Sequence, residues 1–290
     1  MTTENIVFQI EDTPSVERPS LEKTDLGFTR YLYIVDDVKS SLILSILERK
    51  RDEAMFWAYE LYFSGFKEEV LNLLEMTVHY MYSSRYPGLV RFLEKKKREW
   101  KETNAYCIVG TFVYNMISRR YDITQFVKQY CKNDELIQCI ERVPTKNVPK
   151  NNIYINLEQK DVKKYITVNH AKPHYLLRTV VKYPVRKNTL DIFDHEHGMF
   201  THQQIQSLYW HYWLYYAGAS QIWKERIAKY GGVFNHERFR IDFARHEQEE
   251  EFYNKYNLEP DEQPKEIQDM NIGTGVEEQL CWVEFYEKYA

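Results

Sequence analysis

The strongest constraint on the fold is a run of almost unbroken apolar side chains between Asp52 and Gly65. Aspartate often caps a helix start by accepting a hydrogen bond from an unpaired N–H, and glycine often ends a helix in a left-handed conformation. The residues between them are apolar around the whole circumference of a helix, which predicts burial among other helices. The run is too short to span a bilayer, which needs about 20 residues. This stretch therefore predicts a soluble helical core.

Amphipathic stripes flank this run on both sides, and Pro87 suits the first position of a helix because its missing N–H needs no partner there. The links between the stripes are short, so we expect five antiparallel helices within residues 38–121. A second strongly helical and aromatic region begins at Thr201. The predicted buried core across both regions comprises Leu42, Ile46, Trp57, Leu61, Gly65, Leu74, Val113, Trp213 and Trp223.

The first region also resembles part of a known family. The matching landmarks are Ser40–Ile46, Asp52–Trp57, Glu60–Leu61, Ser64–Gly65, Leu74 and Pro87–Leu89. In order and spacing they resemble the C-terminal helical collar, or oligomerisation, region of the replication-associated recombination ATPases, which are clamp-loader relatives. The resemblance covers residues 38–121 and implies oligomerisation and a link to DNA replication or repair machinery. No Gly-x-x-x-x-Gly-Lys-[Ser/Thr] loop is present, so the family's ATPase residues cannot be carried over.

The tyrosine and lysine bias of the whole chain also resembles that of helical proteins of large cytoplasmic DNA viruses. This second resemblance implies a place in the virion or in a viral factory of the host cytoplasm. The four cysteines form no Cys-x-x-Cys pair, so we expect free thiols, as in a reducing cytoplasmic compartment, and no zinc site built from them. The N-terminal residues lack the basic start and apolar core of a signal peptide.

The charge balance and the aromatic content of the chain restrict the classes of molecule that it could bind. The 290 residues carry 39 basic and 43 acidic side chains, a net charge of −4, which argues against a protein coated with positive charge for nucleic acid. The 24 tyrosines and 6 tryptophans favour interfaces, because these side chains bury a large area and keep a polar tip. An aromatic-rich core explains the same composition equally well.

The amino-acid composition changes after residue 143, where prolines and asparagines accumulate. We expect a flexible arm at 1–27, a helical collar-like domain at 28–142, a linker at 143–173 and an aromatic-rich helical domain at 174–290 with a hairpin at 233–243. The segment from Phe28 to Val35 has the composition of a short strand or an extended docking segment. The predicted fold class is mainly α: an antiparallel helical bundle and a mixed, mostly helical second domain with a small β-hairpin.

Positive charge concentrates on one predicted helix. The residues concerned are Arg91, Lys95, Lys96, Lys97, Arg98, Trp100 and Lys101. Such a helix could grip phosphates, with Trp100 or Tyr106 stacking on bases. The alternative is a solvated helix face without a ligand.

A second cluster combines carboxylates with imidazoles in one stretch: Asp191, Asp194, His195, Glu196, His197 and His202. Oxygen and nitrogen ligands of this kind could hold a divalent metal ion. The spacing matches no His-Glu-x-x-His helix, and a polar loop that caps the next helix explains the same residues. No other cofactor is expected.

These features favour a non-enzymatic helical assembly or adaptor protein that binds protein partners or itself. The alternatives are a DNA-binding accessory factor that uses the basic helix, and a metal-dependent hydrolase or nuclease at Asp191–His202. An adaptor would leave its basic and acidic clusters far apart and open. A nuclease would bring Asp191, Asp194 and a histidine together in a cleft.

Overall fold

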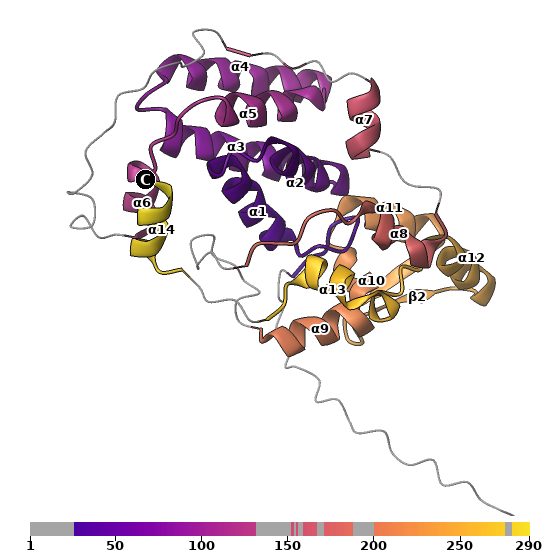
Figure 1. Cartoon of the computed structure of the whole chain (residues 1–290). Coiled ribbons are helices and arrows are strands. Elements are labelled where there is room, and N and C mark those ends of the chain that lie inside the picture. Colours follow the sequence, from indigo (N-terminus) through magenta and orange to yellow (C-terminus); the bar gives the residue numbers. More distant parts are fainter. Residues whose placement is uncertain are drawn as a thin grey trace, which may run out of the picture.

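The computed structural model describes residues 26–131, 152–153, 155, 159–166, 171–187, 200–275 and 280–290. In Figure 1 the indigo-to-magenta helices lie at the top, and most of the orange and yellow helices lie below them. One apolar core runs through both groups. Among the described residues the only sheet is a two-stranded hairpin, so the fold is mainly α with a small β-hairpin, as predicted. None of the described helices combines the length and apolar character that a membrane crossing requires.

The N-terminal bundle consists of α1 (Val35–Leu47), α2 (Arg51–Ser64), α3 (Lys67–Tyr82), α4 (Pro87–Thr103) and α5 (Cys107–Ile117). The central helix is α2, which packs against α1, α3 and α5. Gly65 ends α2 with a φ of 107°, a left-handed conformation that glycine adopts without strain. Pro87 occupies the first turn of α4, as its sequence position predicts. The predicted core side chains are each at most 7% exposed: Leu42, Ile46, Trp57, Leu61, Leu74, Val113, Trp213 and Trp223.

Asp52 does not cap α2, contrary to the sequence prediction. The helix begins at Arg51, and its N-cap residue Lys50 makes no side-chain cap. Asp52 lies in the first turn, where the helix dipole favours a carboxylate. Its oxygens accept hydrogen bonds from the hydroxyls of Tyr165 (3.2 Å) and Tyr183 (2.8 Å).

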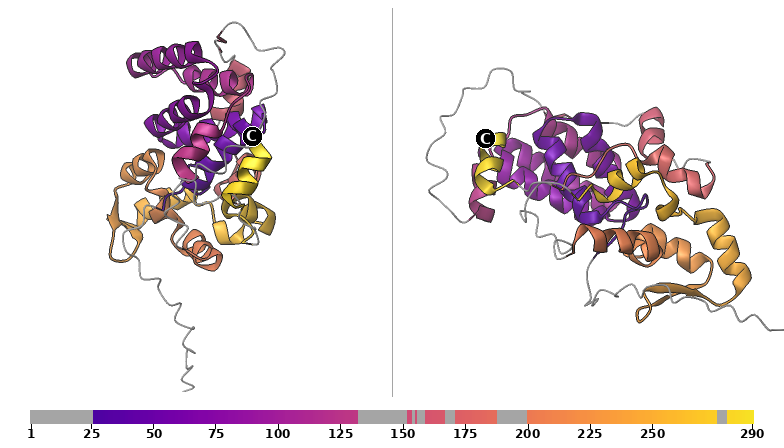
Figure 2. Two further views of the ribbon diagram at one scale, coloured as in Figure 1. Left: turned by 90° about the vertical axis from the view of Figure 1, so that its left-hand side faces the viewer. Right: turned by 60° about the horizontal axis from the view of Figure 1, so that its bottom comes forward.

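The lower part of the molecule contains α8 (Pro173–Val180), α9 (His202–His211), α10 (Trp213–Ala217), α11 (Gln221–Lys229), β1 (Gly232–Asn235), β2 (Arg240–Phe243), α12 (His246–Tyr256) and α13 (Lys265–Ile272). Thr201 caps α9, because its hydroxyl accepts the Gln204 N–H while the Gln204 side chain accepts the Thr201 N–H. The predicted aromatic helix after Thr201 is divided at Tyr212, whose φ of −127° separates α9 from α10. The strands are antiparallel, and the hairpin stands at the edge of the molecule (Figure 2).

The last helix returns to the N-terminal bundle. α14 (Trp282–Tyr289) packs against α6 (Thr124–Cys131), and the rings of Phe126 and Phe285 lie 6.4 Å apart (Figure 1). The Tyr289 hydroxyl donates to Glu48 at 2.9 Å. Phe285 of this helix is fully buried, whereas Val283 is 40% exposed. The last helix is therefore attached to the N-terminal bundle through α6 and Glu48.

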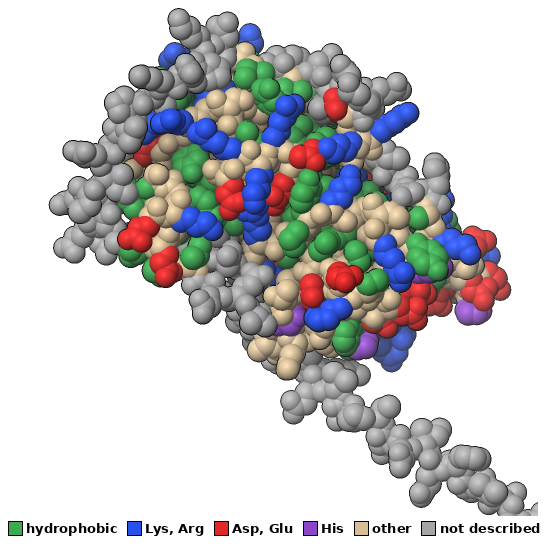
Figure 3. Space-filling view, viewed as in Figure 1, with side chains coloured by type: hydrophobic (Ala, Val, Ile, Leu, Met, Phe, Trp, Pro, Cys, Tyr) green, Lys and Arg blue, Asp and Glu red, His purple; other side chains and the backbone are tan. Residues whose placement is uncertain are grey.

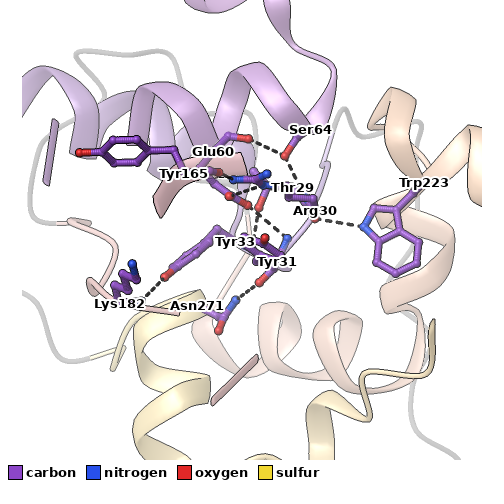
Figure 4. A network of polar contacts seen from close by, with 10 residues as sticks. All are labelled: Thr29, Arg30, Tyr31, Tyr33, Glu60, Ser64, Tyr165, Lys182, Trp223 and Asn271. Carbon is purple, nitrogen blue, oxygen red and sulfur yellow. Dashed lines mark hydrogen bonds and ion pairs between the residues drawn. The ribbon is translucent and has the colours of Figure 1, made fainter. Parts of the chain in front are cut away.

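The segment between Phe28 and Val35, predicted to be a short strand or an extended docking segment, is a buried loop closed by a bridge between Phe28 and Ile34. Figure 4 shows how its polar groups are satisfied by distant elements. The indole N–H of Trp223 donates to the Thr29 carbonyl at 3.3 Å, and the Asn271 side chain donates to the Tyr31 carbonyl at 2.6 Å. The loop thus attaches α11 and α13 to the N-terminal bundle. Its backbone carbonyls accept hydrogen bonds from side chains of these helices, so a segment with strand-like composition is accommodated without a sheet.

An ion pair anchors this loop to α2. Arg30 Nε donates to Glu60 at 2.9 Å, and the two side chains are 6% and 0% exposed. The second carboxylate oxygen of Glu60 accepts the backbone N–H of Tyr31 at 3.2 Å. Arg30 also donates to the carbonyl of Tyr165 in α7 (Gln159–Ile166) at 2.6 Å. Burial of both charges is tolerated because each has several partners.

Candidate interaction surfaces

The basic residues of α4 divide into a solvent-facing group and a paired group. Arg91, Lys95 and Arg98 are spaced by four and three residues, which places them on one exposed side of the helix, and Lys101 is exposed beside them. None of these four cations forms an ion pair with any residue that the structure describes. We refer to Arg91, Lys95, Arg98 and Lys101 as the basic face of α4.

The remaining members of the predicted nucleic-acid site are engaged elsewhere. Lys96 pairs with Glu99 at 2.6 Å, and Lys97 pairs with Glu75 of α3. Trp100 is only 5% exposed, and its indole N–H donates to the hydroxyl of Tyr62 at 3.1 Å. Trp100 therefore belongs to the core and has no free ring face for a base. The sequence prediction grouped Trp100 with the basic residues because it follows them directly in the chain. The helix repeat instead places it on the side opposite the exposed cations.

Asp191, Asp194, His195, Glu196 and His197, the core of the predicted metal cluster, lie outside the described residues. Within the described ranges, no group of three or more metal-ligating side chains comes together. His202 sits at the start of α9, and its buried Nδ1 has no hydrogen-bond partner among the described residues. Burial and the nearby charge of Lys187 lower the pKa of His202.

Negative charge gathers at the other end of the molecule. Figure 3 shows acidic side chains at the lower right, where Figure 1 places α12. Glu247, Glu250 and Glu251 are exposed and lie on the side of α12 that faces away from the hairpin groove described below. We refer to these three residues as the acidic face of α12. Figures 1 and 2 both place it far from α4.

A groove of about 460 Å³ runs beside the hairpin. All four residues of β2 line it, although successive side chains of a strand point to opposite faces of a sheet. The groove therefore contacts β2 along its whole length. No residue of β1 lines it. Its other walls come from the α9–α10 junction, residues 211–215, and from Glu249 and Tyr253 of α12. We refer to this feature as the β2 groove.

Aromatic and charged side chains both line the β2 groove. The rings of Tyr215 and Phe239 lie 5.2 Å apart in edge-to-face contact. Arg240 pairs with Asp242 at 2.6 Å, and the hydrogen bond from Asn235, with the charge of Arg240, lowers the pKa of Asp242. Asp242 is therefore an anion at neutral pH.

A second hollow, of about 430 Å³, lies between α3 and α4 and is more apolar. Met76, Val90 and Leu93 contribute to its walls, and Phe112 of α5 also lines it. Nothing on its surface selects one kind of occupant.

A polar cluster at the start of α2 is structural. Arg186 donates to both oxygens of Glu53, at 3.0 and 2.9 Å, and pairs with Glu48 at 2.7 Å. Burial alone would raise the pKa of Glu48, but hydrogen bonds from Lys50, Arg186 and Tyr289 lower it to about 2. These contacts join the segment after α8 to the bundle.

Sequence reasoning missed the β2 groove, including Tyr215, Phe239 and Glu249. The signal that was available is the hairpin itself, because an isolated two-stranded sheet always has two unpaired edges. The sequence could not reveal which edge is covered, since that depends on where α10 and α12 pack.

Comparison with known protein families, curated proteins and solved structures gave no significant match for this chain. The interaction surfaces must therefore be interpreted from their own chemistry.

Proposed function

We propose that this chain is a non-enzymatic assembly or adaptor protein that holds protein partners at its two charged ends. The observation that supports the proposal is that α4, which carries the basic face, and α12, which carries the acidic face, lie at different ends of one body with a continuous core (Figure 1). Exposed charges attract and orient partners of opposite sign. The packed core would then fix the distance between a partner at one end and a partner at the other.

The two faces are complementary to each other, so a second copy of the chain is the simplest partner for either face. The faces lie at opposite ends, and one chain cannot satisfy both by itself. A contact between two different surfaces is heterologous, and it continues head to tail into a ring or a filament. The resemblance of residues 38–121 to an oligomerisation region supports the same proposal.

The resemblances also suggest where the assembly acts. The collar-like landmarks favour a link to DNA replication or repair machinery in the cytoplasm or a viral factory. The likeness to proteins of large DNA viruses favours a structural role in a virion as a variant of the same function. Both remain proposals that rest on these resemblances.

A second candidate function is DNA binding through the basic face of α4, which the absence of ion pairs at its four cations favours. Phosphate contacts make affinity fall with salt by about 0.9 in log–log slope per contact, so four contacts predict a slope of about −3.6. Fluorescence anisotropy with a labelled duplex measures this slope. Affinity that does not change with salt would exclude the basic face as the DNA site.

The adaptor proposal is tested by cross-linking pull-down with the full chain and two charge-reversal variants. The variants are Arg91→Glu/Lys95→Glu/Arg98→Glu for the basic face and Glu247→Lys/Glu250→Lys/Glu251→Lys for the acidic face. We expect each reversal to remove second copies of the chain and, in addition, any other partner of the reversed face, while circular dichroism stays that of the parent. The proposal fails if neither reversal removes any partner.

A further inference from the structure

Arg226 of α11 is a partly buried cation without a counter-ion among the described residues. Its guanidinium carbon lies 4.4 Å from the ring centroid of Trp223 and 5.1 Å from that of Tyr256. Trp223 is fully buried, and its indole N–H is used by the Thr29 carbonyl (Figure 4). Within the described ranges of the chain, Arg226 makes no hydrogen bond and no ion pair. Arginine stays protonated at any physiological pH, so this charge persists in the folded protein.

Contact with the two rings leaves the donors of Arg226 without an oxygen acceptor. A guanidinium has five N–H groups in one plane, and a cation–π contact attracts its charge but supplies no oxygen to them. The nitrogens of Arg226 are not among the fully buried, unpartnered atoms of the described residues, so solvent reaches these donors. An oxygen atom of a ligand can therefore reach them as well. The rings also restrict the side chain, which lowers the entropy cost of binding.

The nearby charges do not compensate Arg226. Glu60 acts on it, but this carboxylate is fully buried, pairs with Arg30 at 2.9 Å and accepts the Tyr31 N–H at 3.2 Å. Burial lowers the pKa of Arg226 and the charge of Arg30 adds to this effect, whereas two tyrosines and Glu60 oppose it. Glu60 thus neutralises Arg30 and leaves the second guanidinium uncompensated. An added anion would stabilise that second charge.

Two exposed lysines lie at the same aromatic cluster. Lys229 Nζ lies 5.9 Å from the ring centroid of Tyr230, and Lys255 Nζ lies 5.7 Å from that of Tyr256. The two tyrosine rings are 6.0 Å apart. Neither lysine forms an ion pair with a residue that the structure describes. The lysines would therefore attract an anion towards Arg226.

The chemistry of the guanidinium and the neighbouring acidic face restrict the kind of anion. Phosphate and carboxylate groups accept two parallel N–H···O bonds from one guanidinium, which a halide ion cannot do. Glu251 of the acidic face precedes Lys255 by one turn of α12. A long polyanion such as nucleic acid would therefore meet negative charge beside the lysines. A single oxyanion group would not extend that far.

We propose that Arg226 anchors a binding site for one oxyanion group, the phosphate or carboxylate of a small molecule. The guanidinium donates two N–H···O bonds to this group, and Lys229 and Lys255 attract it from a longer distance. The site belongs to neither of the two charged faces, so it goes beyond the proposed adaptor function.

The test is isothermal titration calorimetry of the full chain with three probes that share a benzene ring. Phenyl phosphate and benzoate carry the two oxyanion groups, and benzyl alcohol carries no charge. All titrations are made in chloride at one ionic strength, so general attraction of anions is the same throughout. We expect saturable binding of at least one anion and none of benzyl alcohol. The anion that binds more tightly identifies the class of ligand.

Three variants separate contact with Arg226 from general attraction. Arg226→Lys keeps the charge but loses the planar set of donors, and Arg226→Met loses both. Arg98→Met is the matched control, because it removes an exposed arginine of α4 that also lacks an ion pair with the described residues. We expect Arg226→Lys to weaken binding about tenfold, Arg226→Met to abolish it and Arg98→Met to leave it within about twofold.

Thermal unfolding distinguishes a binding role of Arg226 from a structural one. Without an anion, Arg226→Met should melt at or above the temperature of the parent chain, because it removes an uncompensated charge. With the tighter anion, the parent should melt at a higher temperature and Arg226→Met should not change. The inference is overturned if neither anion binds, if benzyl alcohol binds as well as the anions, or if Arg98→Met weakens binding as much as the Arg226 variants do.

Discussion

Removing either member of the Arg30–Glu60 pair should be among the most destabilising single changes in this protein. The two side chains are 6% and 0% exposed, and their ion pair joins the buried Phe28–Ile34 loop to α2 (Figure 4). Glu60→Leu would leave the guanidinium buried, with the Tyr165 carbonyl as its remaining hydrogen-bond acceptor among the described residues. Loss of one partner from a buried pair costs about 3–5 kcal/mol. We expect Arg30→Met to cost a similar amount, because it leaves a buried carboxylate.

The double variant Arg30→Met/Glu60→Leu is the sharper test. It removes both charges together, so the remaining cost is that of the unmatched Tyr31 N–H and Tyr165 carbonyl, about 1–3 kcal/mol each. We therefore expect the double variant to be destabilised by much less than the sum of the two single variants.

Urea unfolding of the full chain, followed by circular dichroism, measures all three free energies of unfolding. The exposed Lys265–Asp269 pair on α13 provides a control, since its lysine is 80% exposed and Asp269→Ala should cost only about 0.2–0.5 kcal/mol. The reasoning is refuted if the single variants cost less than about 1 kcal/mol, or if their effects add in the double variant.

Three further predictions follow from burial and charge. Trp57→Ala should lower the free energy of unfolding by about 3–5 kcal/mol, because Trp57 is fully buried, whereas Val283→Ala should change it by less than about 0.5 kcal/mol; thermal melts that rank them otherwise contradict the core assignment. The folded pKa of Glu48 is about 2 against an ordinary 4.5, so Glu48 contributes to the free energy of unfolding above pH 4.5, and this contribution is lost as the pH falls toward 2. Glu48→Gln should therefore flatten the pH dependence of the free energy of unfolding between pH 4.5 and pH 2. Purified protein should hydrolyse no ATP above background, because the chain has no phosphate-binding loop; activity that co-purifies with the folded protein and disappears in Trp57→Ala would contradict this.

Local signals in the sequence predicted the helices well. Gly65 and Pro87 mark a helix end and a helix start through conformations that depend only on the residue itself, and Thr201 with Gln204 forms a capping box within four residues. The hairpin at 233–243 was also predicted, because alternation and a polar turn are local properties.

Features that depend on distant partners could not be predicted. The Phe28–Ile34 loop has strand-like composition, yet its backbone groups bond to side chains from α11 and α13. Trp100 is a different case: it was assigned to a binding face because it adjoins a basic run, although the helix repeat already places it opposite that face, where it donates to Tyr62. The β2 groove exists only because α10 and α12 pack beside one edge of the hairpin.

The most direct test of the two-ended assembly is sedimentation velocity of the two charge-reversal variants, alone and mixed. The variant with a reversed basic face has two acidic ends, and the variant with a reversed acidic face has two basic ends. We predict that the parent chain self-associates at low salt, that each variant alone is monomeric, and that an equimolar mixture associates again. A parent chain that stays monomeric at high concentration and low salt, or a mixture that does not recover association, would contradict the account.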